Sequence, residues 1–160
     1  MPTLRSLNKT GVELRGKEAS LQVFPADAPK KQPSNASYVL LSAPKDKTPD
    51  FVLSWPGEYD YAGTSIKGIG QNEGKQVSYV VTMEDLRMGF ISTPLRDWAD
   101  YEIEMLGDLD VLVIPGDDAK LVQKILEEVD PPVIIPLKTK QETWSDVLSV
   151  CGAKETEPLK

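Results

Sequence analysis

Residues 106–136 read LGDLDVLVIPGDDAKLVQKILEEVDPPVIIP, and this stretch decides the fold class. The apolar run Val111–Pro115 predicts a short strand. Gly116-Asp117-Asp118 then predicts the start of a helix, whose apolar residues recur at helical spacing until Pro131-Pro132 ends it. A second apolar run, residues 133–136, predicts the last clear strand. Strands that alternate with helices in this order are typical of a layered α/β domain.

Short segments with strand alternation fill most of the chain before this stretch. We predict these strands at residues 12–15, 20–24, 38–42, 51–54, 76–83 and 86–91, and we expect residues 58–70 to form an antiparallel meander with the last two. Thr93-Pro94 predicts a helix start, because a hydroxyl cap precedes a proline. Thr139 and Glu142 have the spacing of a capping box before a final helix. We therefore predict one domain over residues 1–160, with helices packed on a largely antiparallel or mixed sheet.

The composition excludes several kinds of chemistry. The chain contains no histidine, so the usual zinc hydrolases, serine hydrolase triads and Cys–His dyads are ruled out. Its net charge of −7 opposes nucleic acid, because an acidic surface repels phosphate backbones. The single cysteine, Cys151, excludes an internal disulfide and fits a reducing compartment. We find neither a signal peptide nor an apolar run long enough for a membrane, and we expect a cytoplasmic protein.

Three landmarks resemble the metallo-β-lactamase superfamily, in the order that this family uses. Pro56-Gly57-Glu58-Tyr59 with Ser65-Ile66-Lys67-Gly68-Ile69, the stretch 106–115 and the strand Val133–Leu137 resemble motifs of its small bacterial branch of predicted zinc-dependent hydrolases, related to the ascorbate-phosphate lactonases. The resemblance covers roughly residues 50–140 and implies a layered α/β, αββα-type fold, here in a shortened form.

The metal ligands of that family are missing from the matching positions. By this resemblance its H-x-H-x-D-H loop corresponds to residues 42–48, where Ala43, Lys45 and Thr48 fall in the histidine positions and Asp46 or Lys47 in the aspartate position. A further family ligand corresponds to Ser92-Thr93, and the final histidine to Lys138. Zinc requires nitrogen, thiolate or carboxylate donors. We therefore predict no metal and no cofactor, and a vestigial pocket formed by Lys45, Asp46, Lys47, Ser92, Asp117, Asp118 and Lys138.

The acidic residues allow two interpretations. Asp117 and Asp118 could form a hard-cation site with Asp46. The simpler interpretation is that Asp117-Asp118 caps a helix, where negative charge is favoured. Glu58 and Asp60 share one face of a strand, either as an acid/base pair or as a solvated edge. Cys151 lies on an apolar helix stripe and is interpreted as a packed thiol.

The lysines in the former ligand positions suggest a binding role. We predict that Lys45, Lys47 and Lys138 converge, and that they pair with Asp46, Asp117 or Asp118 or else hold an anion. Trp98 and Trp144 are predicted to be core anchors from two helices, whereas Trp55 is the better interface candidate.

Two functions follow from these observations. The first is a catalytically inactive metallo-β-lactamase-like domain that acts in binding, scaffolding or regulation, with a protein partner, a second copy or a small anionic ligand. The alternative is a hydrolase with a metal held by carboxylates or with a site completed by a partner subunit.

Overall fold

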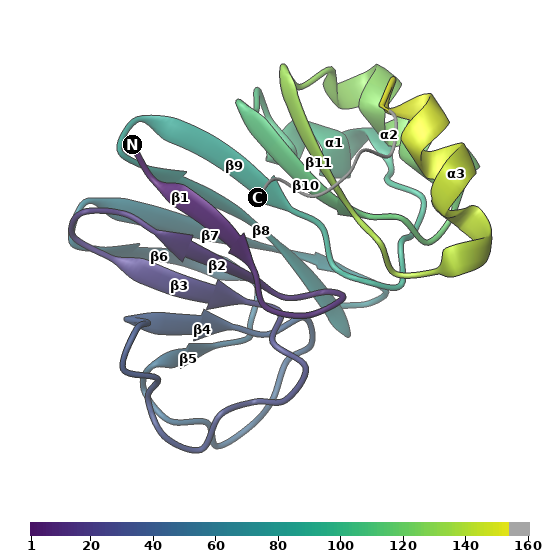
Figure 1. The fold of residues 1–160 in the computed structure, drawn as a ribbon. Coiled ribbons are helices and arrows are strands. Elements are labelled where there is room, and N and C mark those ends of the chain that lie inside the picture. Colours follow the sequence, from purple (N-terminus) through teal and green to yellow (C-terminus); the bar gives the residue numbers. More distant parts are fainter. Residues whose placement is uncertain (154–160) are drawn as a thin grey trace.

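Two β-sheets packed face to face form the body of the computed structural model, which describes residues 1–153 (Figure 1). The first sheet has the strand order β1-β2-β3-β4-β5. Its strands are β1 (Thr3–Ser6), β2 (Val12–Arg15), β3 (Ser20–Val23), β4 (Tyr38–Leu40) and β5 (Val52–Leu53). The first three strands pair antiparallel, and β4 and β5 then continue the sheet in parallel.

The second sheet has the order β11-β10-β9-β8-β7-β6. Its strands are β6 (Gly57–Tyr61), β7 (Thr64–Gln71), β8 (Gln76–Met83), β9 (Leu86–Phe90), β10 (Val111–Pro115) and β11 (Val133–Leu137). Strands β6 to β9 form the predicted antiparallel meander, but residues 58–70, predicted as one segment, belong to two strands, β6 and β7. Strands β9, β10 and β11 are parallel to one another. The sheet is therefore mixed, as the sequence predicts.

Three helices belong to the described residues: α1 (Asp100–Leu106), α2 (Ala119–Val129) and α3 (Gln141–Val150). They lie on the side of the second sheet that faces away from the first sheet (Figure 1). None of the helices within residues 1–153 is long and apolar enough to cross a membrane. The predicted domain of residues 1–160 also includes residues 154–160, which lie outside the described part.

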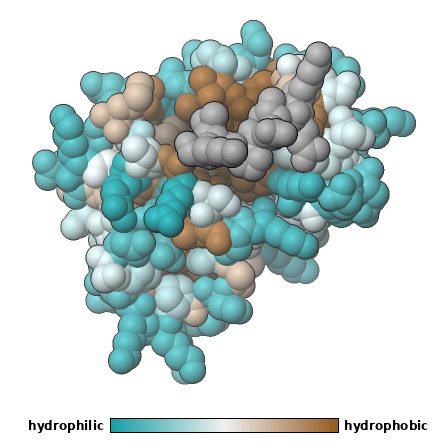
Figure 2. Space-filling model, in the orientation of Figure 1, coloured by the Kyte–Doolittle hydropathy of each residue, from teal (hydrophilic) through white to brown (hydrophobic). Residues whose placement is uncertain are grey.

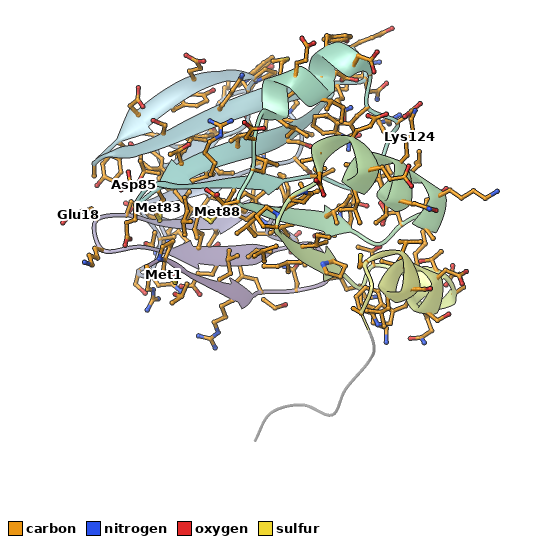
Figure 3. All side chains as sticks on the ribbon, turned by 90° about the horizontal axis from the view of Figure 1, so that it is seen from above. Met1, Glu18, Met83, Asp85, Met88 and Lys124 are labelled. Atoms are coloured by element: carbon orange, nitrogen blue, oxygen red, sulfur yellow. The ribbon has the colours of Figure 1, made fainter. Side chains whose placement is uncertain are left out.

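Two apolar cores result from this layering. The first lies between the sheets, where Leu14 and Leu21 of the first sheet meet Tyr79, Met88 and others of the second. Figure 3 shows Met83 and Met88 between the two sheets. The second core lies between the second sheet and the helices and contains Val80, Leu112, Trp98, Val122 and Ile125, among other residues. Strand β10 thus buries both of its faces, which explains its nearly continuous apolar sequence.

The segment between β9 and β10 differs from the prediction. Thr93-Pro94 is a cis peptide bond and not a helix start, and α1 begins only at Asp100. Leu95 and Trp98 are buried in the second core from an irregular loop, whereas Tyr101 is exposed. The three-residue spacing of Leu95 and Trp98 also fits a helix, so the sequence pattern could not distinguish a helix from this loop.

The capping box predicted for the last helix is also wrong. The N-cap of α3 is Lys140, and no side chain caps it. The hydroxyl of Thr139 donates instead to the carboxylate of Asp117, at the end of another strand. Trp144 is only half-buried, so the prediction of a core anchor is wrong for Trp144. Trp98 is buried as predicted, but it lies in the loop before α1 and not in a helix.

Candidate functional site

Three loops meet where the parallel strands β9, β10 and β11 end. Carboxyl ends of parallel strands lie at one edge of a sheet, and ligand sites of α/β proteins form there. The loops begin with Ser92-Thr93, Gly116-Asp117 and Lys138-Thr139. The backbone N–H of Gly116 donates to the carbonyl of Leu137 at 2.8 Å. A Cβ at Gly116 would lie 2.9 Å from that oxygen, so glycine permits this close approach.

Asp117 lies at the centre of this strand-end site and is only 9% exposed. Its Oδ2 accepts hydrogen bonds from the hydroxyl of Thr93 and from the backbone N–H of Leu95, the latter at 2.7 Å. Its Oδ1 accepts from the hydroxyl of Thr139. The carboxylate therefore connects the loops after β9 and β11 through the end of β10.

Ser92 is completely buried beside this site, in a polar network that the sequence did not reveal. Its backbone N–H donates to the hydroxyl of Ser78 at 3.0 Å. The side-chain amide of Gln76 donates to the Ser92 hydroxyl and to the carbonyl of Pro94, both at 2.9 Å. Arg96 donates to the amide oxygen of Gln76 at 2.6 Å. The network fixes the loop after β9 against the start of β8.

The sequence signal for this network was ambiguous. Gln76 and Ser78 alternate with Val77 and Tyr79 along β8, which is also the pattern of a strand with one face in water. Both polar residues are in fact buried, because the loop after β9 covers that face. Only the tertiary structure distinguishes the two cases.

Asp118 has a different role from its neighbour. It is the exposed N-cap of α2, and its Oδ1 accepts from the backbone N–H groups of Lys120 and Leu121 at 3.0 and 3.1 Å. The helix-cap interpretation is therefore confirmed for Asp118. Asp117 does not cap the helix, because its carboxylate points to the loops on either side.

Lys45, Asp46 and Lys47 are exposed on the loop between β4 and β5. The backbone N–H of Lys45 donates to the hydroxyl of buried Ser54 at 3.1 Å. Lys45 and Lys47 line a recess of about 240 Å³ together with residues 28–30.

Lys138 is exposed and does not line this recess. Its ammonium lies 6.0 Å from the centroid of the Trp144 ring on α3. The ion pairs within residues 1–153 are Met1 with Glu84, Arg15 with Glu13, and Lys124 with Asp97. The predicted pairing of Lys45, Lys47 and Lys138 with aspartates is thus wrong for this part of the chain. The structure places the two loop lysines in one recess that Lys138 does not line.

Solved structures with the same arrangement of sheets and helices establish the fold. A predicted zinc-dependent hydrolase of the metallo-β-lactamase superfamily from Thermotoga maritima superposes with a TM-score of 0.73, at 20% identity, over 92% of this chain and 84% of that protein. The chain has the metallo-β-lactamase fold. YhfI from Bacillus subtilis, a metallo-β-lactamase fold protein, superposes with a TM-score of 0.60, at 10% identity, over 88% of this chain and 85% of that one.

A third structural neighbour is larger than this chain. CmlA, a diiron β-hydroxylase from Streptomyces venezuelae, superposes with a TM-score of 0.62, at 10% identity, over 97% of this chain and 48% of that protein. No protein-family model matches the sequence, and no curated protein matches it either. These superpositions establish the metallo-β-lactamase fold. At such low sequence identity they do not establish the chemistry of this chain, which has to be argued from the residues at its own site.

The residues at the strand-end site do not fit the metal that the metallo-β-lactamase fold implies. Lysine offers three donors and no lone pair, so Lys138 cannot ligate a cation while it is protonated. The Asp117 carboxylate already accepts three hydrogen bonds. Within residues 1–153, no group of three carboxylate or thiol side chains is arranged to hold a metal ion. The alternative cation site of Asp46, Asp117 and Asp118 is therefore not supported.

Trp55 lies outside the strand-end site, in the turn before β6. It is 51% exposed, and its backbone carbonyl accepts a hydrogen bond from the Tyr59 hydroxyl at 2.8 Å. Its role at an interface stays a prediction.

Proposed function

We propose that this chain is a catalytically inactive domain of metallo-β-lactamase fold that acts by binding, in scaffolding or regulation. One observation carries the proposal: the carboxylate of Asp117 is engaged by Thr93, Leu95 and Thr139. An ionised carboxylate has about four lone-pair sites, and three of them accept hydrogen bonds here. This carboxylate holds neighbouring loops together in the way a structural hydrogen-bond network does, and it is poorly prepared to bind a cation.

The residues around Asp117 support the same proposal. Ser92 is enclosed by Gln76 and Ser78, so its hydroxyl faces no solvent from which a substrate could approach. Lys138 supplies positive charge at the position that the resemblance assigns to a histidine ligand. We propose a protein partner or a second copy of the chain as the binding partner, with Trp55 at the contact, since aromatic residues are enriched at interfaces. We also propose a cytoplasmic location.

Metal content and hydrolysis of the purified protein test this proposal. The protein would be purified from zinc-supplemented medium and measured by plasma mass spectrometry. It would then be assayed against ester, lactone and phosphodiester substrates. We expect metal well below one equivalent and no hydrolysis above that of buffer. We also expect an unchanged melting temperature in EDTA, because no metal contributes to folding stability.

One equivalent of zinc, iron or manganese together with hydrolysis would overturn the proposal. The variants Asp117→Asn and Asp118→Asn would then locate the metal, with Asp146→Asn on the exposed face of α3 as the control. Hydrolysis that develops only as the protein concentration rises would indicate a site completed by a second subunit.

A further inference from the structure

A recess near the end of the molecule that carries β4 and β5 gathers positive charge from two loops. Its volume is about 240 Å³, and it is lined by Ala28, Pro29, Lys30, Lys45, Lys47, Thr48, Pro49 and Val52. Figure 2 shows mostly hydrophilic residues at this lower end of the molecule. The two loops are separated by β4, so the fold brings Lys30 and the later lysines together. The lining of the recess shares no residue with the strand-end site.

The three lysines of the recess have no carboxylate partner within residues 1–153. None of the ion pairs there includes Lys30, Lys45 or Lys47. The neighbouring acidic residues in the sequence, Asp27, Asp46 and Asp50, do not line the recess. Ammonium groups that share a small space repel one another. Three lysines therefore line one recess of a chain whose net charge is −7, and an anion bound there would offset their repulsion.

The backbone of the second loop is held in a defined conformation. Lys47 has φ = 54°, in the left-handed region that lysine rarely adopts. The hydroxyl of Ser54 accepts from the Lys45 N–H at 3.1 Å and lies 3.4 Å from the Lys45 carbonyl, to which it donates. Ser54 is buried, so the loop is anchored to the body of the protein directly beside the lysines.

We propose that this recess binds the phosphate group of a small soluble phosphate ester. A phosphate monoester carries a charge of about −1.5 to −2 near neutral pH, which suits several ammonium groups better than a carboxylate does. Lysine binds phosphate as a point charge and needs no bidentate geometry. Thr48 adds a hydroxyl donor to the lining. The volume of about 240 Å³ lies below that of sites for drug-sized ligands, so a small ligand fits best. This binding site goes beyond the function proposed above and does not depend on it.

Titration of the full chain tests the site, with inorganic phosphate and ribose 5-phosphate as probes and acetate at equal ionic strength as the reference. Amide chemical shifts would be followed in ¹H–¹⁵N spectra. We expect saturable shifts at Ala28, at Lys30 and at residues 45–48 with both phosphates, and none with acetate. The triple variant Lys30→Gln, Lys45→Gln, Lys47→Gln should weaken binding at least about tenfold, because charge-assisted hydrogen bonds dominate phosphate binding.

A matched triple variant at other exposed lysines, Lys120→Gln, Lys138→Gln, Lys140→Gln, removes the same charge and should leave the affinity unchanged. Equal weakening in the two triple variants, or shifts that do not saturate, would overturn the proposal. Binding to phosphatidic acid vesicles without binding to soluble phosphate would also overturn it, in favour of a lipid headgroup. Lys45→Gln alone provides the same comparison if the triple variant does not fold. The proposed function is tested by metal content and hydrolysis, and neither depends on whether the recess binds phosphate. A failure of the phosphate proposal can therefore be distinguished from a failure of the proposed function.

Discussion

Adjacent aspartates at the end of β10 have opposite environments. Asp117 is buried and accepts hydrogen bonds from the loops on either side, whereas Asp118 is exposed and caps α2. The sequence predicts that both aspartates cap a helix, and this is correct for Asp118 only. Assigning the second carboxylate required the positions of Thr93 and Thr139, which lie 24 and 22 residues away.

Replacing Asp117 with alanine should destabilise the protein more than replacing Asp118 or Asp146 with alanine. The change leaves the buried N–H of Leu95 without its acceptor, and an unsatisfied buried donor costs about 1–3 kcal/mol. The hydroxyls of half-buried Thr93 and Thr139 lose their acceptor as well. Asp118→Ala removes only a helix cap, with an expected loss of about 0.5–2 kcal/mol. Urea unfolding followed by circular dichroism measures both free energies. Asp146→Ala is the control, and an equal stability for Asp117→Ala and Asp146→Ala would contradict the assigned role.

The thiol of Cys151 should react slowly in the folded protein. Burial raises its pKa, so a smaller fraction is the nucleophilic thiolate at a given pH. The folded state therefore holds this proton more tightly than the unfolded state. The resulting stabilisation is complete below the unfolded thiol pKa and is lost as the pH rises through the folded pKa. Melting temperatures of the wild type and Cys151→Ala, measured from pH 7 to pH 10, should differ most at the low end and converge at the high end.

A rapid reaction of Cys151 with a disulfide reagent at neutral pH would contradict this assignment. The rate in urea-unfolded protein gives the reference. A ratio of folded to unfolded rates near unity would mean that the thiol is accessible and unperturbed.

The loop between β9 and α1 is the element that sequence reasoning misjudged. Leu95 and Trp98 are three residues apart, and both a helix and this loop direct such a pair into the second core. Thr93 resembles a capping residue because hydroxyls favour helix starts, but here its hydroxyl donates to Asp117. Strands were easier to predict, because the segments at 76–83, 111–115 and 133–137 have apolar patterns bounded by turns or proline. The partners of a polar group depend on distant segments, and a local pattern does not contain them.

Trp98 should be the most important tryptophan for stability. It is 2% exposed within the second core, and truncation of a buried tryptophan to alanine costs about 3–5 kcal/mol. Its Nε1 finds no hydrogen-bond partner within the described residues, so Trp98→Phe should recover most of the loss. Trp55→Ala is the control at an exposed position and should change the unfolding free energy little. A similar loss in Trp55→Ala and Trp98→Ala, measured by urea unfolding, would refute the core assignment.

On the scale of the whole molecule, Tyr79 is a polar link between the two sheets. Its hydroxyl extends from β8 and donates to the carbonyls of Leu41 and Leu53, at 2.7 and 3.2 Å, beside β4 and β5. Burial, with a smaller contribution from Tyr59, raises the pKa of Tyr79, so the hydroxyl stays protonated and keeps this role. The alternation of β8 predicts that Tyr79 is buried, but not that it reaches the other sheet.

Tyr79→Phe should lower stability by about 1–3 kcal/mol while preserving the packing of the ring, because the two carbonyls lose a shared donor. Thermal unfolding measures the loss. Tyr61→Phe, at an exposed position on β6, is the control and should be nearly neutral. Equal melting temperatures for Tyr79→Phe and the wild type would show that the link contributes nothing.

The order of strands has a consequence for synthesis on the ribosome. In both sheets each strand lies beside the one that precedes it in the sequence, so pairing begins as soon as a strand emerges. Short sequence separations between partners favour fast folding. The first sheet is complete once residue 53 has emerged, yet the inner face with Leu14 and Leu21 has no cover until β7, β8 and β9 follow. We expect chains stalled between these points to expose an apolar sheet face and to be the forms that chaperones bind during translation.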